Sequence, residues 1–117
     1  MHILLVEDHD DTRMVLSKLL DHCGHDVSPA ASLREALDLL ATFRFDGLVS
    51  DIGLPDGDGF EVVTQARKQQ RDLRITVAVT AFGSAADRER GREAGFDCYM
   101  TKPFDFAALR GVLANAA

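Results

Sequence analysis

Residues 3–8 of the chain read ILLVED, four large apolar residues followed at once by two acids. Four apolar residues in succession are typical of a strand that is buried on both faces of a sheet. Further short apolar runs occur at residues 47–50 (GLVS), 75–79 (ITVAV) and 96–100 (FDCYM). The segments between the runs have helical periodicity, are too long for hairpins and suit crossover helices. The pattern predicts parallel βαβ units and therefore an α/β fold.

The first helix is expected directly after the two acids. It follows a cap at Asp10 or Asp11 and runs up to Gly24, which supplies the left-handed exit. A strand is expected at residues 26–30, at the edge of the sheet because Pro29 has no amide to donate. Helical spacing predicts one buried stripe on this first helix, made of Val15, Leu16, Leu19, Leu20 and Cys23.

Four more helices complete the predicted alternation of strand and helix. The fourth of the five carries Gly91 in its interior and few large apolar residues, so we expect it to be the loosest. The third is expected to bury Phe60, Val63 and Ala66 and to leave residues 67–71 in solvent. The starts of these helices are marked by a capping box of Ser32 and Glu35, by Gly57 and Gly59, by a capping box of Ser84 and Asp87, and by Pro103.

Size and charge exclude several classes of protein. The chain has 117 residues, a formal net charge of −6 and 46% apolar residues, which suits one domain with its own core. A net negative charge argues against binding to nucleic acid. The short apolar run near the start, followed by acids, fits neither a signal peptide nor a membrane span, so we expect a cytoplasmic protein. Cys23 and Cys98 are not in CxxC spacing and are expected to be free, buried thiols.

Polar residues follow the expected strands at the point where each strand ends: Glu7, Asp8, Asp51, Thr80 and Lys102. In a doubly wound sheet, reactive groups gather at these carboxyl ends. Three carboxylates would repel one another there, and hard oxygen ligands select Mg²⁺ as the compensating cation, with the carbonyl of Gly53 as a further ligand. Lys102 and Thr80 would bind anionic oxygens at the same centre. The set predicts phosphoryl transfer to a carboxylate.

Taken together and in order, these residues resemble the receiver domains of two-component response regulators. The likeness covers essentially the whole chain, and it rests on the acidic pair, the stretch 51–55 (DIGLP), the pair Thr80 and Ala81, and the stretch 102–104 (KPF). It implies a flavodoxin-like, doubly wound (βα)5 fold with a five-stranded parallel sheet in the order 2-1-3-4-5. It also implies that residues 1–117 form a single receiver domain.

The resemblance assigns a role to each site residue. Asp51 becomes the phosphoryl acceptor, and Glu7 and Asp8 hold Mg²⁺, with Glu7 acting through water. Thr80 and Lys102 contact the phosphoryl oxygens, and the peptide bond between Lys102 and Pro103 is expected to be cis. Other roles are a switching aromatic at Tyr99, a small residue at Ala81 that leaves the acceptor open, and tuning of hydrolysis at Gly53 and Phe82. Glycine and phenylalanine at these last positions predict slow to intermediate hydrolysis of the phosphoryl group.

The resemblance also implies partners and context. A histidine kinase or a histidine phosphotransfer domain would donate the phosphoryl group, and the domain would catalyse its own phosphorylation and dephosphorylation. It would be a monomer or a weak dimer through the fourth helix, fifth strand and fifth helix. A stand-alone regulator, a hybrid histidine kinase and a transcription factor are all open as sources, although residues 6–12 and 101–106 are most similar to receivers attached to sensor kinases. These residues contain no DNA-binding output domain.

Three other functions use part of this pattern. A phosphohydrolase of the haloacid dehalogenase type also has an aspartate nucleophile and Mg²⁺, but it needs a second acid where this chain has Gly53. A flavodoxin-like nucleotide module needs a phosphate loop rich in glycine and hydroxyl residues after the first strand, where this chain has acids. A pseudo-receiver that serves as an interaction module is disfavoured by the intact acidic set.

Overall fold

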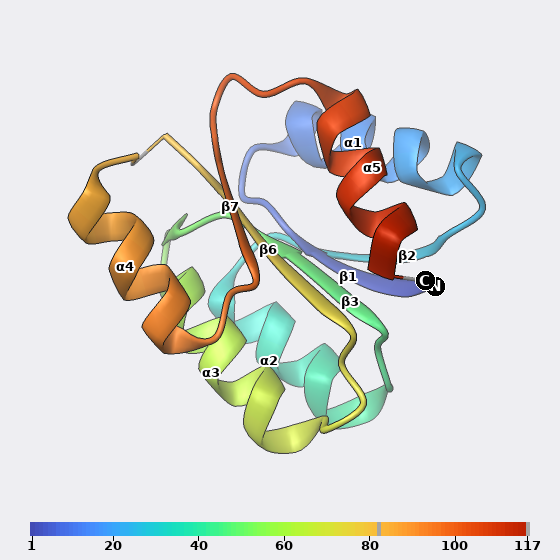
Figure 1. The fold of residues 1–117 in the computed structure, drawn as a ribbon. Coiled ribbons are helices and arrows are strands. Elements are labelled where there is room, and N and C mark those ends of the chain that lie inside the picture. Colours follow the sequence, from blue (N-terminus) through green and yellow to red (C-terminus); the bar gives the residue numbers. More distant parts are fainter. Residues whose placement is uncertain (82, 117) are drawn as a thin grey trace.

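The computed structural model describes residues 1–81 and 83–116. Its centre is a parallel five-stranded sheet in the order β2-β1-β3-β6-β7 (Figure 1). This confirms the predicted doubly wound order, with β2 at one edge. The strands are β1 (His2–Val6), β2 (Asp26–Ala30), β3 (Gly47–Ser50), β6 (Ile75–Thr80) and β7 (Cys98–Thr101).

Five helices cover both faces of the sheet. They are α1 (Asp10–His22), α2 (Leu33–Thr42), α3 (Gly59–Gln69), α4 (Ala85–Ala94) and α5 (Phe106–Ala116). α1 and α5 lie on one face, and α2, α3 and α4 lie on the other (Figure 1). A short antiparallel pair, β4 (Gly53–Leu54) and β5 (Gly57–Asp58), leads into α3 and was not predicted. Within the described residues, no helix combines the length and the apolar character needed to cross a membrane.

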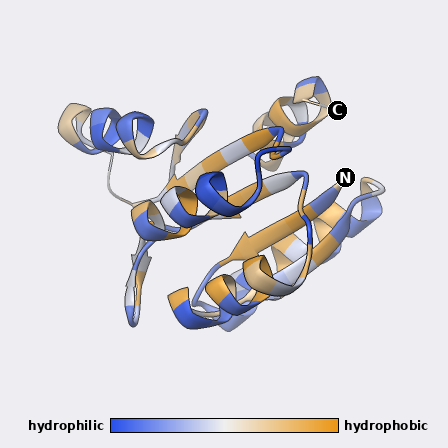
Figure 2. Ribbon diagram, turned by 90° about the horizontal axis from the view of Figure 1, so that it is seen from below, coloured by the Kyte–Doolittle hydropathy of each residue, from blue (hydrophilic) through white to orange (hydrophobic). Residues whose placement is uncertain are grey.

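The alternation of side chains along β1 divides the core into two clusters. Leu4 and Val6 pack with residues of α2 and α3, whereas Ile3 and Leu5 pack with residues of α1 and α5. All four side chains are at most 1% exposed. Figure 2 shows the corresponding hydrophobic colouring of the strands. Burial on both faces explains why the run that opens the sequence is continuously apolar.

α1 departs from the prediction at its start and along its face. Its N-cap is His9, so Asp10 and Asp11 are helical residues, not caps. Its buried residues are Leu16 and Leu20, while Val15 and Leu19 are 54% and 37% exposed. Cys23 is also exposed and Cys98 is half-buried, so the prediction of two buried thiols is wrong. A narrow row of residues on α1 packs against the sheet, and the remaining apolar residues of the helix face solvent.

The prediction that residues 67–71 lie in solvent is wrong for Arg67 and Gln70. Gln70 is 5% exposed: its Oε1 accepts from the amide of Phe45 at 2.7 Å, and its Nε2 donates to the carbonyl oxygens of Leu40 and Phe43. Arg67 is half-buried and donates to the carbonyl oxygen of Gly95. These side chains make hydrogen bonds to backbone groups outside the sheet and thereby satisfy them. A periodicity pattern does not predict such hydrogen bonds.

The predicted boundaries of α4 are confirmed. Ser84 is the N-cap, its Oγ accepts from the amide of Asp87 at 3.1 Å, and the helix ends at Gly95, whose φ is +123°. The next strand, β7, starts at Cys98 and not at residue 96 as predicted. Phe96 precedes it as a core residue that is 4% exposed.

Candidate functional site

The carboxyl ends of the strands bring the predicted acids together. The amide of Asp51, directly after β3, donates to the carbonyl oxygen of Val6 at 2.8 Å, so the ends of β1 and β3 are tied to each other. The amide of Glu7 donates to Ala30 on the other neighbour of β1, at 3.0 Å. Glu7 and Asp51 are 2% and 8% exposed. The sheet therefore places two carboxylates side by side with little solvent around them.

Lys102 lies between these two carboxylates. Its Nζ donates to Oε1 of Glu7 at 2.7 Å and to Oδ2 of Asp51 at 3.0 Å. Its amide donates to the carbonyl oxygen of Thr80 at 2.7 Å, and its peptide bond to Pro103 is cis, as expected. The loop after β7 thus brings a positive charge to acids that are 95 and 51 residues away in the chain.

The electrostatic balance differs between the two acids. Burial by itself raises the pKa of Glu7, but the hydrogen bond and charge of Lys102, with the amide of His9, lower it to about 2. Burial raises the pKa of Asp51, and the opposing hydrogen bond from Lys102 does not offset it. Burial lowers the pKa of Lys102, yet its bonds to Glu7 and Asp51 raise it overall. Lys102 is therefore held as the cation.

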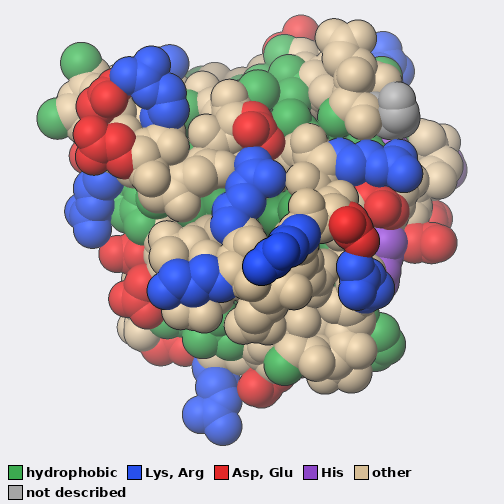
Figure 3. All heavy atoms as spheres, turned by 60° about the horizontal axis from the view of Figure 1, so that its bottom comes forward, with side chains coloured by type: hydrophobic (Ala, Val, Ile, Leu, Met, Phe, Trp, Pro, Cys, Tyr) green, Lys and Arg blue, Asp and Glu red, His purple; other side chains and the backbone are tan. Residues whose placement is uncertain are grey.

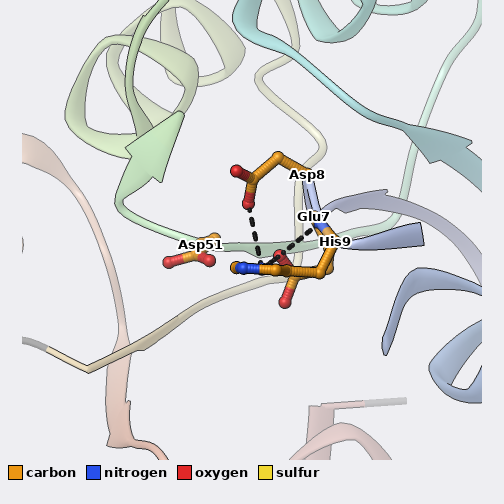
Figure 4. Close-up of side chains that lie close together, drawn as sticks. All are labelled: Glu7, Asp8, His9 and Asp51. Carbon is orange, nitrogen blue, oxygen red and sulfur yellow. Dashed lines mark hydrogen bonds and ion pairs between the residues drawn. The ribbon is translucent and has the colours of Figure 1, made fainter. Parts of the chain in front are cut away.

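Glu7, Asp8, His9 and Asp51 form a cluster that could hold a cation. Each offers one ligand atom, and these atoms lie within 4.8 Å of one another (Figure 4). Oδ1 of Asp8 is buried and makes no hydrogen bond among the described residues. Carboxylate oxygens are the ligands that Mg²⁺ prefers, so this donor set fits the predicted ion. The prediction did not include His9, although it directly follows the acidic pair in the sequence.

The other predicted site residues lie on the strands and loops next to Asp51 and Lys102 in the chain or in the sheet. Thr80 ends β6 and is fully buried, and Ala81 after it is exposed. Gly53 is exposed and begins the short strand pair of β4 and β5, two residues after Asp51. Tyr99 is half-buried in β7. Phe82 lies outside the described residues.

Gly59 positions Asp51 and was not recognised as a site residue. Its amide donates to the carbonyl oxygen of Ile52 at 2.8 Å, and a Cβ at this position would lie 2.3 Å from the carbonyl oxygen of Asp51. The amide of Ile52 donates to Oδ1 of Asp51 at 2.7 Å, which orients the carboxylate. α3 can begin this close to Asp51 because residue 59 has no side chain.

The sequence and the fold are similar to those of known proteins. The sequence matches the family model of the response regulator receiver domain over residues 3–114. The response regulator MprA of Mycolicibacterium vanbaalenii is 42% identical over 115 residues, which cover 98% of this chain and 48% of MprA. This chain therefore spans about half the length of that relative.

Two solved structures share the fold over nearly the full chain. The non-phosphorylated HemR receiver domain from Leptospira biflexa is 33% identical with a TM-score of 0.88, and the match covers 98% of this chain and 92% of that one. The response regulator TrrA from Thermotoga maritima, in complex with Mg²⁺ and BeF, is 28% identical with a TM-score of 0.86, covering 99% and 98%.

Proposed function

The chain belongs to the response regulator receiver domains of two-component signalling, and from this premise we propose that Asp51 accepts a phosphoryl group in a reaction that depends on Mg²⁺. We further propose that residues 1–117 act as one such domain. The observation that carries the proposal is the convergence of Glu7, Asp51 and Lys102, joined by hydrogen bonds of 2.7 and 3.0 Å at the carboxyl ends of the strands.

The step is a transfer between two nucleophiles. An Oδ atom of Asp51 forms the new bond to phosphorus, while the bond between phosphorus and the imidazole nitrogen of a donor phosphohistidine breaks. The donor imidazole leaves with the electron pair of that bond and takes up a proton, and Asp51 becomes an acyl phosphate. Two hydrogen bonds hold the carboxylate of Asp51 in one orientation for this attack. The amide of Ile52 donates to Oδ1, and Nζ of Lys102 donates to Oδ2.

Charge is the main obstacle to this step, because a phosphoryl group must approach several carboxylates. Glu7, Asp8 and Asp51, with the carbonyl of Gly53, would hold Mg²⁺, and the ion supplies positive charge next to the transferring oxygens. Lys102 supplies a second positive charge, and Thr80 supplies a hydroxyl at the end of β6. Residue 53 is an exposed glycine, so no acid stands where an aspartate-based phosphohydrolase needs one.

We propose that phosphorylation is read at α4, β7 and α5. Thr80 and Tyr99 lie on adjacent strands: the register pairs Thr80 with Thr101 and Ala78 with Tyr99. A phosphoryl group on Asp51 would draw the Thr80 hydroxyl towards it, and the ring of Tyr99 would rearrange next to α4. This face would then bind a target or a second copy of the chain, which corresponds to the predicted monomer or weak dimer.

Receiver domains take their phosphoryl group from histidine kinases, and α1 offers a surface for such a donor. Three of the large apolar side chains exposed among the described residues, Met14, Val15 and Leu19, lie on this helix. Val15 also lines a shallow apolar pocket together with Phe104 from the loop after β7. The surface adjoins the acids because α1 starts two residues after Asp8. We propose that a helix of the kinase or phosphotransfer domain that carries the phosphohistidine packs here.

The charged surface gives no support for nucleic acid as the partner. On the face that α2, α3 and α4 turn to solvent, Lys and Arg side chains are interspersed with Asp and Glu (Figure 3). The net charge of the chain is −6. Binding to a phosphate backbone needs a surface of predominantly positive sign.

Intact mass spectrometry tests this function. The protein is incubated with Mg²⁺ and acetyl phosphate, beside an Asp51→Asn variant and a sample with EDTA. We expect a labile gain of one phosphoryl group, which disappears in the variant and with EDTA. A gain that persists in the variant would move the acceptor elsewhere. If no gain occurs although Mg²⁺ binds, the chain is a pseudo-receiver.

A further inference from the structure

We propose that His9 is a nitrogen ligand of the cation site, which makes the site bind Mn²⁺, Co²⁺ or Zn²⁺ in preference to Mg²⁺. The inference rests on the proposed cation site and names the class of ion that this particular chain selects. A receiver site built from oxygen ligands alone has no such preference beyond the intrinsic order of the metals.

The position of the imidazole supports this role. Nδ1 of His9 lies 3.3 Å from Oε2 of Glu7 and 3.4 Å from Oδ1 of Asp8. Figure 4 shows the ring of His9 between these two carboxylates, with its edge towards Asp51. Ligands at about 2.1 Å from one ion are separated by roughly 3 Å when adjacent and roughly 4 Å when opposite. The spacing of His9 from both acids therefore suits a shared cation.

The two oxygens of Glu7 divide their contacts between Lys102 and His9. Oε1 accepts from Lys102 at 2.7 Å, and Oε2 accepts from the amide of His9 and lies 3.3 Å from its Nδ1. Oδ1 of Asp8, the other neighbour of the imidazole, is buried and makes no hydrogen bond within the described residues. A cation between His9 and Asp8 would bind this oxygen, whose contact in the structure is Nδ1 of His9 at 3.4 Å.

The side-chain contacts of the imidazole are to the acids of this site: Nδ1 lies within hydrogen-bonding distance of Oε2 of Glu7 and pairs with Oδ1 of Asp8. His9 is the N-cap of α1, but its side chain makes no capping hydrogen bond. The side chain is 71% exposed, so it can turn towards an ion without disturbing the core. Its connection to α1 is through its backbone, whose carbonyl oxygen accepts from the amide of Arg13 at 2.9 Å.

The chemistry of the added ligand determines which metal ion the site binds more tightly. A neutral imidazole offers a nitrogen lone pair, which suits Mn²⁺, Co²⁺ and Zn²⁺, whereas Mg²⁺ takes oxygen ligands and retains several waters. Exchange of one water for His9 therefore strengthens binding of a transition metal and leaves binding of Mg²⁺ nearly unchanged.

Metal-binding measurements on the wild-type chain and matched variants test the proposal. His9→Ala removes the imidazole without removing a capping bond, and His22→Ala removes an exposed histidine at the other end of α1. Affinities for Mn²⁺ and Mg²⁺ are measured by titration and competition, with the electron paramagnetic resonance signal of free Mn²⁺ as the probe. Electron spin-echo modulation by ¹⁴N shows directly whether a nitrogen binds Mn²⁺.

We expect His9→Ala to weaken Mn²⁺ binding by about tenfold or more, since even changes behind metal ligands commonly cost this much. Binding of Mg²⁺ should change by less than about twofold, because Mg²⁺ favours oxygen ligands. The ¹⁴N modulation of bound Mn²⁺ should vanish in His9→Ala and persist in His22→Ala.

Two results would overturn the assignment. Equal losses for both ions in His9→Ala would mean that His9 positions the acids and does not bind the ion, and bound Mn²⁺ without ¹⁴N modulation in the wild type would exclude ligation. These outcomes differ from a failure of the proposed function, which would appear in the mass spectrum as no phosphoryl gain that depends on Asp51.

Discussion

α3 and α4 are neighbours on the same face of the sheet, yet they are held there by different forces. Both begin at a side-chain cap, Asp58 for α3 and Ser84 for α4. α3 buries Phe60, Val62 and Val63 together with the small residues Gly59 and Ala66, whereas Gly91 is the one buried residue within α4. In Figure 2, α4 is correspondingly drawn almost entirely hydrophilic, at the left. Apolar burial contributes about 1.5–3 kcal/mol for each large side chain, so α3 is far more firmly attached.

α4 is attached mainly by contacts of its charged side chains, because it has no extensive apolar face. The guanidinium of Arg90 lies 4.2 Å from the centre of the Phe60 ring and 3.8 Å from a carboxylate oxygen of Asp58. Arg88 donates to Oγ1 of Thr101 at 3.1 Å. Exposed contacts of this kind contribute about 0–1 kcal/mol each. The contrast assigns the two helices separate tasks: α3 fixes Asp51 through Gly59, and α4 is free to respond.

We expect the largest effect from substitution of Lys102, because its hydrogen bonds connect the end of β7, next to α4, with the acids Glu7 and Asp51. Lys102→Met leaves the carboxylates of Glu7 and Asp51 buried without their cation. In EDTA we expect a loss of about 3 kcal/mol in the free energy of unfolding, measured by urea denaturation. Mg²⁺ should restore part of it, because the ion supplies the missing charge. The exposed Lys18→Met serves as the control, and a loss that Mg²⁺ leaves unchanged would contradict the account.

The two acids should respond to pH with opposite signs when Mg²⁺ is removed. The pKa of Glu7 is lowered from 4.5 to about 2, so its charge stabilises the fold above pH 4.5, and this stability is lost as the pH falls towards 2. Glu7→Gln should therefore cost about 3 kcal/mol at pH 7, an amount that follows from the size of the pKa shift, and less in acid.

The pKa of Asp51 is raised, so its ionisation opposes folding at neutral pH and the cost disappears as the carboxyl is protonated in acid. Asp51→Asn should accordingly stabilise the metal-free protein at pH 7, and the gain should shrink at low pH. Urea denaturation of both variants from pH 7 to pH 3 measures the two trends. Parallel trends for Glu7→Gln and Asp51→Asn would contradict the assigned charges.

The same substitution in the two helices sharpens the comparison. Gly59→Ala places a Cβ 2.3 Å from the backbone oxygen of Asp51, and backbone cannot move aside at low cost. We expect a loss of about 1–3 kcal/mol in the free energy of unfolding, together with slower phosphorylation, because Asp51 is displaced. Thermal unfolding and the rate of phosphoryl uptake measure the two effects. Gly111→Ala is the control, because that site is open. An unchanged rate of phosphorylation in Gly59→Ala would show that Gly59 does not position Asp51.

Gly91→Ala should have the smallest effect on stability and a specific effect on Tyr99. Its Cβ would lie 2.9 Å from Cδ2 of the Tyr99 ring, a side chain that can rotate away. The gain in helix propensity, about 1 kcal/mol, offsets much of the contact cost. Tyr99 is the sole tyrosine of the sequence, so 3-fluorotyrosine gives one ¹⁹F resonance. We expect that resonance to shift in Gly91→Ala. An unshifted resonance would show that α4 does not contact Tyr99.

Most of the fold follows from patterns that depend on the sheet. Burial on both faces makes the strands continuously apolar, and the polar residues that end them mark the site, so Glu7, Asp8, Asp51, Thr80 and Lys102 were all found from their positions after strands. The loose character expected for α4 agrees with its single buried residue. The roles of the site residues remain predictions that the experiments above address.

What the sequence did not predict depends on close approach between distant segments. Gly59 reads as part of a turn, and its contact with Asp51 exists only once α3 starts beside β3. Gln70 reads as a solvated residue, yet it satisfies the backbone of the loop after α2. His9 reads as a surface residue until the carboxylates of Glu7 and Asp8 are seen to lie within 3.4 Å of it.

Hydrogen exchange of α3 and α4, followed by mass spectrometry with and without Mg²⁺ and beryllofluoride, tests the central claim most directly. The account predicts that the amides of α4 exchange faster than those of α3 in the free protein. It predicts further that loading Asp51 with beryllofluoride changes exchange in α4 and β7 and leaves α3 unaltered, and that Asp51→Asn abolishes this change. Equal protection of the two helices, or a loaded site with unchanged exchange in α4, would contradict it.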